Sequence, residues 1–193
     1  MDDIVKAALA KWPNVPACYG WLGLDARGQW WMRDERVQLL GSFQDGCEQG
    51  DAAIKGSRLQ HDKLIAFIER NYGVDAEGLA WFQNGPQRVY VELQAAPYIW
   101  RVDENAALSS PLLAAVGAPL ATLVDERGHL YLHTPQGLGI VHSQDMLHAA
   151  NALERGAWPA PTEANAAALP QQFAFVRSPK KCQKRHKNIE ISR

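Results

Sequence analysis

The alternation of polar and apolar residues is most regular in the segment 79–102. Within 88–93 (Arg-Val-Tyr-Val-Glu-Leu) every second residue is apolar, so the predicted strand has one apolar and one polar face. A shorter strand is predicted over 80–83 and a third over 98–102. Residues 84–87 (Asn-Gly-Pro-Gln) favour a turn, because asparagine and glycine tolerate positive φ and proline cannot donate to a ladder. The segment is therefore predicted to be a β-meander with one apolar face.

Helical periodicity and capping residues predict helices elsewhere in the chain. The segment 2–12 begins with two aspartates and ends at Pro13. The segment 59–72 follows Ser57, a potential N-cap, and is closed by Gly73. Two further helices are predicted over 110–116 and 143–153. The buried stripes are predicted to be Ile4, Val5, Ala8, Leu9 and Trp12 in the first helix and Leu64, Ile65, Ile68 and Tyr72 in the second, with Phe67 at its edge.

Asp-x-x-Gly sequences begin at Asp25, Asp75 and Asp125, at intervals of 50 residues. The first and the third lie between predicted strands, in hairpins over 19–33 and 120–133. In such turns aspartate bonds the turn amides and glycine adopts the left-handed conformation. The second sequence directly follows a predicted helix. A duplicated hairpin and three unrelated turns both account for this spacing.

The predicted fold class is α+β, with an antiparallel sheet of hairpins and a meander packed against a few helices. One sheet is expected, and the 59–72 helix is expected to cover its apolar face. Residues 34–56 are polar and punctuated by glycine, so they are predicted to be mainly loop. A strand is predicted over 139–141, and an edge strand over 173–176. The Ala- and Pro-rich segment 158–170 is interpreted as a linker-like crossing.

A single domain is predicted over residues 1–177, followed by a basic tail over 178–193. With 193 residues and 47% hydrophobic residues, the chain is long and apolar enough for a real core. The tail has six basic residues and one acidic residue, or +5, which leaves 14 basic and 20 acidic residues, or −6, for 1–177. Such an acidic body is a poor match for phosphates, so nucleic-acid binding is not expected except through the tail. The tail is either a native arm or a non-native extension, and in either case potentially disordered.

The sequence predicts a cytoplasmic protein without a membrane partner. No apolar stretch approaches the ~18–20 residues that a transmembrane helix requires. The segment 1–13 lacks the long apolar region of a signal peptide. Cys18, Cys47 and Cys182 lie far apart without paired spacing, which favours free thiols over a disulfide framework or a zinc cluster.

The segment 70–101 carries a resemblance to a known family, mainly through residues 82–91 (Phe-Gln-Asn-Gly-Pro-Gln-Arg-Val-Tyr-Val). It resembles an uncharacterised proteobacterial family of unknown function with a hallmark of the type WFQNGPQRVYVEL. The resemblance implies a bacterial, cytoplasmic protein. It implies no catalytic or ligand-binding residues.

The familiar motifs of nucleotide, dinucleotide, zinc-protease and serine-hydrolase sites do not occur in the sequence, so no cofactor is expected. His129 and His133 share one face of a strand, but positions four apart lie ~13 Å apart, too far to share one metal ion. No metal site is therefore predicted. Asp145 and His148 are three residues apart on a predicted helix, where a carboxylate can orient a histidine as a general base. An enzyme with its site there or near Arg88 is the alternative function.

The leading hypothesis is a non-enzymatic protein that binds a small ligand or a protein partner through the polar face and tip of the 79–102 meander. Arg88 can grip an anion with two parallel hydrogen bonds, and the amides offer directional contacts. In the structural alternative Asn84 and Gln87 hold the loop, and Arg88 pairs with Glu92 or a neighbouring strand. Exposed aromatic residues on edge strands also favour a homodimer. Nucleic-acid binding through the basic tail is a third hypothesis. The candidate ligand-binding residues are Gln83, Asn84, Gln87, Arg88, Tyr90 and Arg70.

Overall fold

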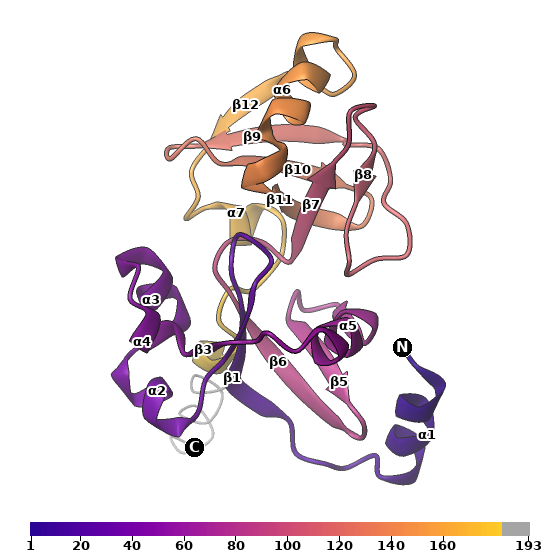
Figure 1. The fold of residues 1–193 in the computed structure, drawn as a ribbon, viewed down its shortest axis with the longest axis vertical. Coiled ribbons are helices and arrows are strands. Elements are labelled where there is room, and N and C mark those ends of the chain that lie inside the picture. Colours follow the sequence, from indigo (N-terminus) through magenta and orange to yellow (C-terminus); the bar gives the residue numbers. More distant parts are fainter. Residues whose placement is uncertain (183–193) are drawn as a thin grey trace, which may run out of the picture. The chain divides into compact units, whose positions relative to one another are not determined.

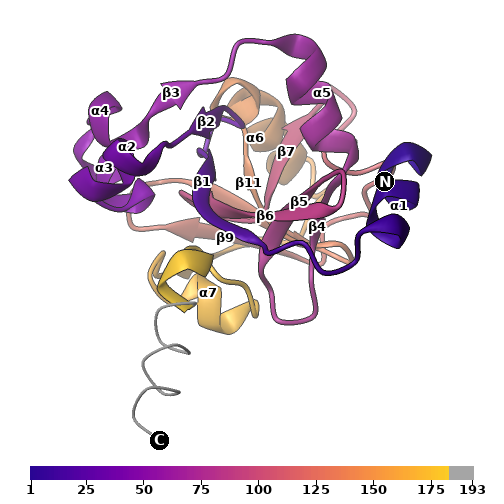
Figure 2. The same ribbon diagram turned by 90° about the horizontal axis from the view of Figure 1, so that it is seen from below.

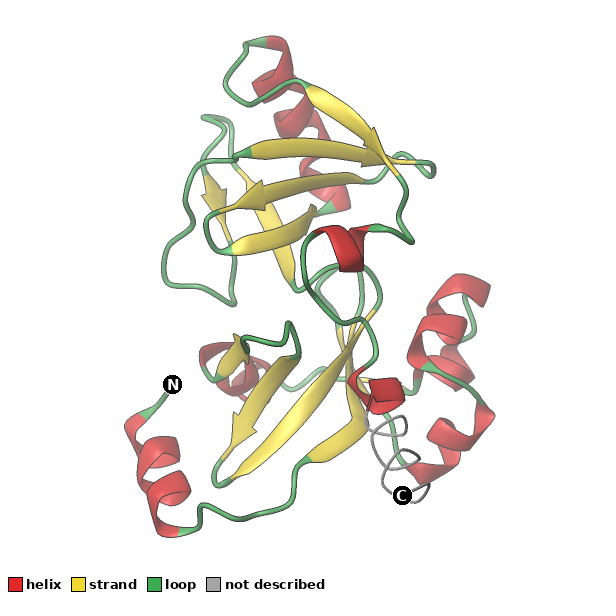
Figure 3. Cartoon of the chain, turned by 180° about the vertical axis from the view of Figure 1, so that it is seen from behind, coloured by secondary structure: helices red, strands yellow, loops and turns green. Residues whose placement is uncertain are grey.

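The structure, a computed structural model, describes residues 1–182 and divides the chain into two compact units (Figure 1). Unit 1 comprises residues 1–25, 29–94 and the segment from Val176 on, and unit 2 comprises residues 26–28 and 95–175. Each unit contains a mixed six-stranded sheet with helices (Figure 3), so the predicted α+β class is confirmed. The division into two units does not test whether they fold together as one domain. The single domain predicted over 1–177 therefore stays a prediction.

In unit 1 the strands are arranged in the order β3-β2-β1-β6-β5-β4. The helix α5 packs its buried Ile68 toward the apolar face of the sheet, where the rings of Phe67 and Phe82 meet edge to face at 5.8 Å. Figures 1 and 2 show α2, α3 and α4 gathered together, away from α5. The strands are β1 (Cys18–Leu24), β2 (Trp30–Met32), β3 (Ser57–Arg58), β4 (Tyr72–Val74), β5 (Ala80–Asn84) and β6 (Gln87–Leu93). The helices are α1 (Asp3–Lys11), α2 (Glu35–Leu40), α3 (Phe43–Gln49), α4 (Ala52–Lys55) and α5 (Asp62–Arg70).

In unit 2 the strands are arranged in the order β12-β9-β10-β11-β7-β8. The fully buried indole of Trp100 donates to the Leu132 carbonyl at 2.9 Å and lies against Gly139, where a Cβ would collide with the ring. The strands are β7 (Tyr98–Val102), β8 (Leu108–Ser109), β9 (Ala121–Asp125), β10 (Leu130–Thr134), β11 (Gly137–Val141) and β12 (Pro161–Ala164). The helical segments are η1 (Ser143–Asp145), α6 (Met146–Glu154) and α7 (Leu169–Gln172).

The two units share a core of five strands with the same connections. In unit 1 the order β2-β1-β6-β5-β4 joins a hairpin, a parallel pair and an antiparallel meander, and in unit 2 the order β8-β7-β11-β10-β9 does the same. The registers of the meanders also agree at an offset of 50 residues. The matching pairs are Val74–Ala80 with Val124–Leu130, and Trp81–Tyr90 with Tyr131–Ile140. The fold of unit 2 is therefore an internal repeat of the core of unit 1.

The three Asp-x-x-Gly turns are evenly spaced in the sequence, but they do not all occupy equivalent positions in the repeat. Asp75 lies between β4 and β5 and corresponds to Asp125 between β9 and β10, so the middle sequence also closes a hairpin. Asp25 between β1 and β2 corresponds to Asp103 between β7 and β8. In all these turns the aspartate Oδ1 accepts from the backbone N–H four residues later, at 2.8 to 2.9 Å. The left-handed residues are Gly28, Gly78, Gly128 and, in the β7–β8 turn, Ala106.

The meander predicted over 79–102 is divided between the two units. β5 and β6 form the predicted hairpin, with Asn84 paired to Gln87. β7 instead pairs with β11 and β8, and the second neighbour of β6 is the parallel strand β1. The prediction of one antiparallel sheet is therefore wrong. β6 and β7 each pair in parallel with a strand that lies far away in the sequence, β1 and β11 respectively.

The prediction that residues 34–56 are mainly loop is wrong, because they form α2, α3 and α4. Side chains cap each helix: Asp34 accepts from the Val37 N–H, Asp51 accepts from the Ala53 N–H, and Ser42 forms a capping box with Asp45. These helices have six, seven and four residues, too few for a helical period to be visible.

The bounds of the 59–72 helix also need correction. α5 begins after His61, whose Nδ1 accepts from the Leu64 N–H, and ends at Arg70. Ser57 therefore lies in β3, and Gly73 lies in β4 rather than capping a helix. The apolar stripe of α1 is largely exposed: Ile4 is 78% exposed and only Val5 is buried.

Other predicted elements in the second half are partly confirmed. Both D-x-x-G hairpins, the strand at 139–141 and the helix over 143–153 are present. No helix forms over 110–116, and the predicted edge strand at 173–176 contributes only an isolated bridge between Leu79 and Val176. The crossing predicted over 158–170 contains β12, whose backbone pairs in parallel with β9.

An ion pair fixes the entry to α6 in unit 2. The carboxylate of Asp145, which is 6% exposed, accepts from Arg101 Nη2 at 3.0 Å and from the Val102 N–H at 3.1 Å. The hydrogen bonds from Arg101 hold the pKa of Asp145 below its usual range. This contact joins the end of β7 to the first turn before α6.

Ala106→Gly is expected to raise the free energy of unfolding by about 0.5–1 kcal/mol, because Ala106 has φ +65 and glycine adopts this conformation without strain. Urea denaturation measures the change. Ala107→Gly in the same turn is the control and is expected to lower stability, since Ala107 is outside the left-handed region. A greater stability for Ala107→Gly than for Ala106→Gly would contradict the prediction.

Arg101→Met is expected to lower the free energy of unfolding at pH 7 by about 1–2 kcal/mol, because it leaves the buried Asp145 carboxylate without its charged partner. A carboxyl group with a lowered pKa stabilises the fold above its unfolded pKa of about 3.9, and this contribution is lost as the pH falls through the folded pKa. The deficit of the variant should therefore shrink below about pH 4. Denaturation curves across pH test this, with the exposed Arg36→Met as control. A deficit that does not change between pH 7 and pH 3 would refute the assignment.

Candidate functional site

The predicted ligand-binding residues do not converge on one site. Gln83, Arg88 and Tyr90 lie on one face of the β5–β6 hairpin, whereas Asn84 and Gln87 share the opposite face with Phe82 and Val89. Arg70 is engaged elsewhere, because its guanidinium bonds the Asp2 carboxylate at 3.2 and 3.3 Å.

The side chains on the predicted polar face have structural partners. Gln83 is buried and donates to the Gly85 carbonyl at 3.1 Å, which holds the turn. The Arg88 guanidinium lies 4.0 Å from the Asp75 carboxylate and 4.4 Å from the centre of the Trp81 ring. The rings of Tyr90 and Tyr19 stack at 4.6 Å. Arg88 is paired, as in the structural alternative, but its partner is Asp75 rather than Glu92. The amide that holds the turn is Gln83 rather than Asn84 or Gln87, since Gln87 donates to the Pro16 carbonyl. Ligand binding by these residues stays a prediction.

The enzyme alternative at Asp145 and His148 lacks its central contact. The Asp145 carboxylate bonds Arg101 and Val102 and makes no hydrogen bond to His148. Arg101 competes successfully because a guanidinium carries a permanent charge and two parallel donors. Within residues 1–182 no group of three or more His, Cys, Asp or Glu side chains is suited to a metal ion.

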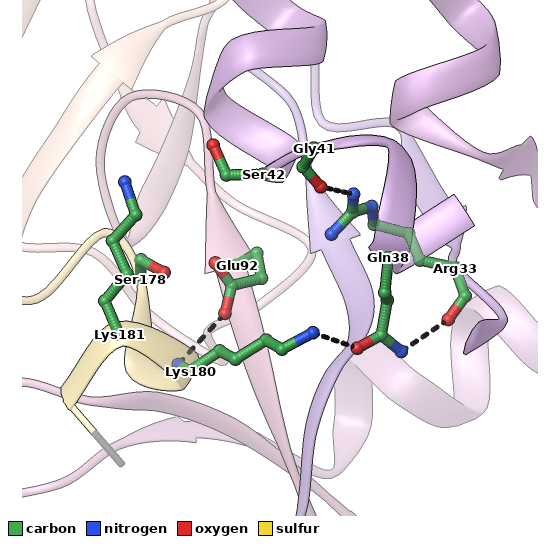
Figure 4. Close-up of a pocket in the computed structure, with 8 residues that line it drawn as sticks. All are labelled: Arg33, Gln38, Gly41, Ser42, Glu92, Ser178, Lys180 and Lys181. Atoms are coloured by element: carbon green, nitrogen blue, oxygen red, sulfur yellow. Dashed lines mark hydrogen bonds between the residues drawn. The ribbon is translucent and has the colours of Figure 1, made fainter. Parts of the chain in front are cut away.

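A polar pocket of about 190 Å³ lies in unit 1, on the face of the sheet opposite α5 (Figure 4). Its lining residues come from the end of β2, from α2 and the α2–α3 connection, from β6 and from residues 178–181. They are Arg33, Gln38, Gly41, Ser42, Glu92, Ser178, Lys180 and Lys181. Only Glu92 belongs to the meander from which the site was predicted.

Local packing explains how these segments meet. Phe43, at the start of α3, is fully buried against Gly23 of β1, where a Cβ would collide with its ring. This contact sets α3, and therefore Ser42, over the polar face of the sheet. The C-terminal segment is held by the Leu93 N–H, which donates to the Arg177 carbonyl at 2.8 Å. Part of the predicted basic tail is thus packed into unit 1, while its residues 183–193 lie outside the described residues.

Arg33 is the principal cation of the pocket. It is 2% exposed, and its Nε and Nη2 donate to the carbonyls of Ile54 and Gly41 at 2.7 to 3.2 Å. Its Nη1 donates to none of the residues 1–182, and Figure 4 shows the guanidinium directed toward the pocket. Burial lowers the pKa of Arg33, whereas the negative charge of Glu92 opposes this effect. The guanidinium stays charged, because arginine does not lose its proton in proteins.

Glu92 balances this charge. Its Oε1 accepts from the Lys180 N–H at 3.2 Å and its Oε2 from Gln44 Nε2 at 3.3 Å, and it is 2% exposed. Lys180 Nζ continues the network by donating to Gln38 Oε1 at 2.6 Å. A buried carboxylate with these partners avoids most of the cost of its desolvation.

Several donors of the pocket lack an acceptor. The Oγ of Ser178 is buried and has no hydrogen-bond partner among the described residues. Lys181 is exposed and makes no ion pair within residues 1–182. The positive charges of Lys181 and Arg33 contribute, after the hydrogen bonds from Ser42, to a lowered pKa of Asp45. The pocket therefore combines unpaired donors with a positive potential.

Sequence reasoning missed this pocket for identifiable reasons. No sequence pattern distinguishes the buried Arg33 from arginines on the surface. Lys180 and Lys181 were assigned to the tail. The one available signal was the Ser42–Asp45 capping box, which marks the start of α3. Nothing in the sequence indicated that β6, α3 and the C-terminal segment pack together.

Comparisons with known proteins establish the family and little beyond it. No solved structure matches the chain. A stretch of 43 residues is 46% identical to aspartate–tRNA(Asp/Asn) ligase of Rhodopirellula baltica, but it covers 22% of this chain and 7% of the ligase.

No helix within residues 1–182 is long and apolar enough to cross a membrane.

A family model described as "Protein of unknown function (DUF2946)" matches residues 1–180. The expectation that the chain belongs to a family of unknown function is therefore confirmed, whereas the hallmark within residues 82–91 and a proteobacterial origin stay predictions. The chain belongs to this family of proteins of unknown function (DUF2946).

Proposed function

We propose that this protein is a non-enzymatic binding protein of the bacterial cytoplasm, and that it holds a small anionic ligand in the polar pocket of unit 1. The single observation that carries the proposal is the meeting of two unpaired donors, Arg33 Nη1 and Ser178 Oγ, in one cavity. Ser178 Oγ is buried without a partner among the described residues, which costs about 1–3 kcal/mol that an acceptor on a ligand recovers.

The charges of the lining favour an anion. Arg33, Lys180 and Lys181 oppose one acid, Glu92, so the formal charge of the lining is +2. The acid is already bonded at both oxygens, by Lys180 and Gln44, and so offers little to a cation. Carboxylate and phosphate groups, which are acceptors with several lone pairs, complement this set of donors.

The absence of a general base near Ser178 supports binding rather than catalysis. A serine nucleophile needs a base within hydrogen-bond reach, and Ser178 Oγ contacts none within residues 1–182. The size of the cavity, about 190 Å³, suits a compact metabolite rather than a polymer. The three cysteines form no disulfide with one another, as expected for thiols in the reducing cytoplasm.

Inorganic phosphate and malonate, as probes of the two anion classes, are expected to raise the melting temperature of the full chain at low ionic strength, because they bind the native state. Lys181→Ala is expected to weaken binding by about three- to tenfold, by losing an attractive charge. Lys63→Ala on α5 is the matched control, since Lys63 is exposed and outside the pocket. Isothermal titration gives the dissociation constants. The proposal fails if neither anion binds, or if both variants lose affinity equally.

Ser178→Ala separates a ligand-binding serine from a structural one. The hydroxyl has no partner in the unliganded protein, so its removal is expected to leave the melting temperature unchanged or slightly higher. The same change is expected to weaken phosphate or malonate binding by about tenfold, because a hydrogen bond to a charged group is lost. A variant with full affinity and a lower melting temperature would make Ser178 a structural residue.

A further inference from the structure

A second cavity of unit 1 lies on the opposite face of the sheet, between the strands and α5. Its volume is about 300 Å³. Phe82 and Val89 line it from the sheet, Ile68 lines it from the helix, and Leu59 lines it from the connection before the helix. We refer to this cavity as the apolar cleft. It shares no lining residue with the polar pocket.

Among residues 1–182, no charged residue lines the apolar cleft. Its rim includes large apolar side chains that remain accessible to solvent: Trp21 is 41%, Met32 48% and Leu64 38% exposed. Exposed apolar side chains that gather around one concavity, rather than singly, are typical of a binding site. Methionine adapts its shape to a ligand, and the indole of tryptophan offers a flat apolar surface.

Polar groups are also present in the lining. Asn84 and Gln87, which face each other across the β5–β6 turn, both line the cleft. Gln87 donates to the Pro16 carbonyl at 3.1 Å, which leaves its amide oxygen as an acceptor, and the Asn84 side chain makes no hydrogen bond within residues 1–182. Neutral amides can donate and accept, so they recognise a hydroxyl, carbonyl or amide without requiring a charge.

We propose that the apolar cleft binds a small neutral molecule with an apolar body, whose polar end meets the amides of Asn84 and Gln87. Size decides between this occupant and a macromolecule. Pockets for drug-sized ligands begin at about 300 Å³, whereas a stable protein partner buries about 800 Å² on each side. Charge decides between a neutral and an ionic ligand, because a buried ion without a partner pays a desolvation cost that this lining cannot return.

The probe for the test is N-phenyl-1-naphthylamine, a neutral dye whose fluorescence increases in apolar surroundings. We expect saturable binding to the full chain, with one dye per chain. Leu64→Lys places an ammonium group at the rim and is expected to raise the dissociation constant at least about tenfold. Leu147→Lys is the matched control, because Leu147 is 72% exposed and lies on α6 of unit 2. Its affinity should equal that of the unchanged protein.

Two further measurements keep the inference falsifiable. Thermal melts of both variants show whether Leu64→Lys still folds, and if it does not, Met32→Lys at the same rim takes its place. Cys18 lines the cleft and Cys182 does not, so the dye should slow the labelling of Cys18 alone by a maleimide, as read by peptide mass spectrometry. Equal loss of affinity in Leu64→Lys and Leu147→Lys, or no protection of Cys18, would overturn the proposal. So would a dimer that Leu64→Lys converts to monomer, since it would assign the cleft to a second copy of the chain.

Discussion

The fold of each unit depends on a parallel pairing between the first and the last of five strands. In unit 1 Leu22 of β1 lies opposite Val91 of β6, and in unit 2 Trp100 of β7 lies opposite Val141 of β11. These pairs join segments that are far apart in the sequence, so they close a long loop and carry its entropic cost. Once the pair forms, the antiparallel hairpins on either side add with short turns. The two sheets consequently separate between β6 and β7, in the middle of what reads as one continuous meander.

The two faces of β6 explain why unit 1 has two cavities of different chemistry. Val89 and Val91 point to the side that α5 covers, where the apolar cleft lies. Glu92 points to the other side, where Phe43 packs on Gly23 and brings α3 over the strand. Alternation along a single strand thus supplies a hydrophobic wall on one side and a buried carboxylate on the other. The carboxylate is tolerable there because Lys180 and Gln44 bond it and Arg33 offsets its charge.

The internal repeat clarifies what the Asp-x-x-Gly spacing meant. Asp75 and Asp125 occupy equivalent turns at an offset of 50, whereas Asp25 is equivalent to Asp103. The turn that begins at Asp103 has no Asp-x-x-Gly sequence, because its left-handed residue is Ala106 rather than glycine. The aspartate is the common element, since its carboxylate bonds the amide four residues later in each turn. The hydrogen bond from the backbone N–H to the aspartate is therefore common to all these turns, whereas the glycine is not.

The sequence by itself determined the local elements: the β5–β6 hairpin, the two D-x-x-G hairpins, α1 and the helix that includes α6. Each depends on contacts between residues that are close in the chain, such as turn amides, caps and alternating faces, and these are visible in a short window. Only the tertiary structure decided that β7 leaves β6, that α3 packs over the sheet, and that Arg33, Glu92 and Ser178 meet. Those outcomes depend on packing between distant segments, in particular Phe43 on Gly23 and Arg177 beside Leu93. The free energy of such contacts is set by three-dimensional complementarity, which no local pattern encodes.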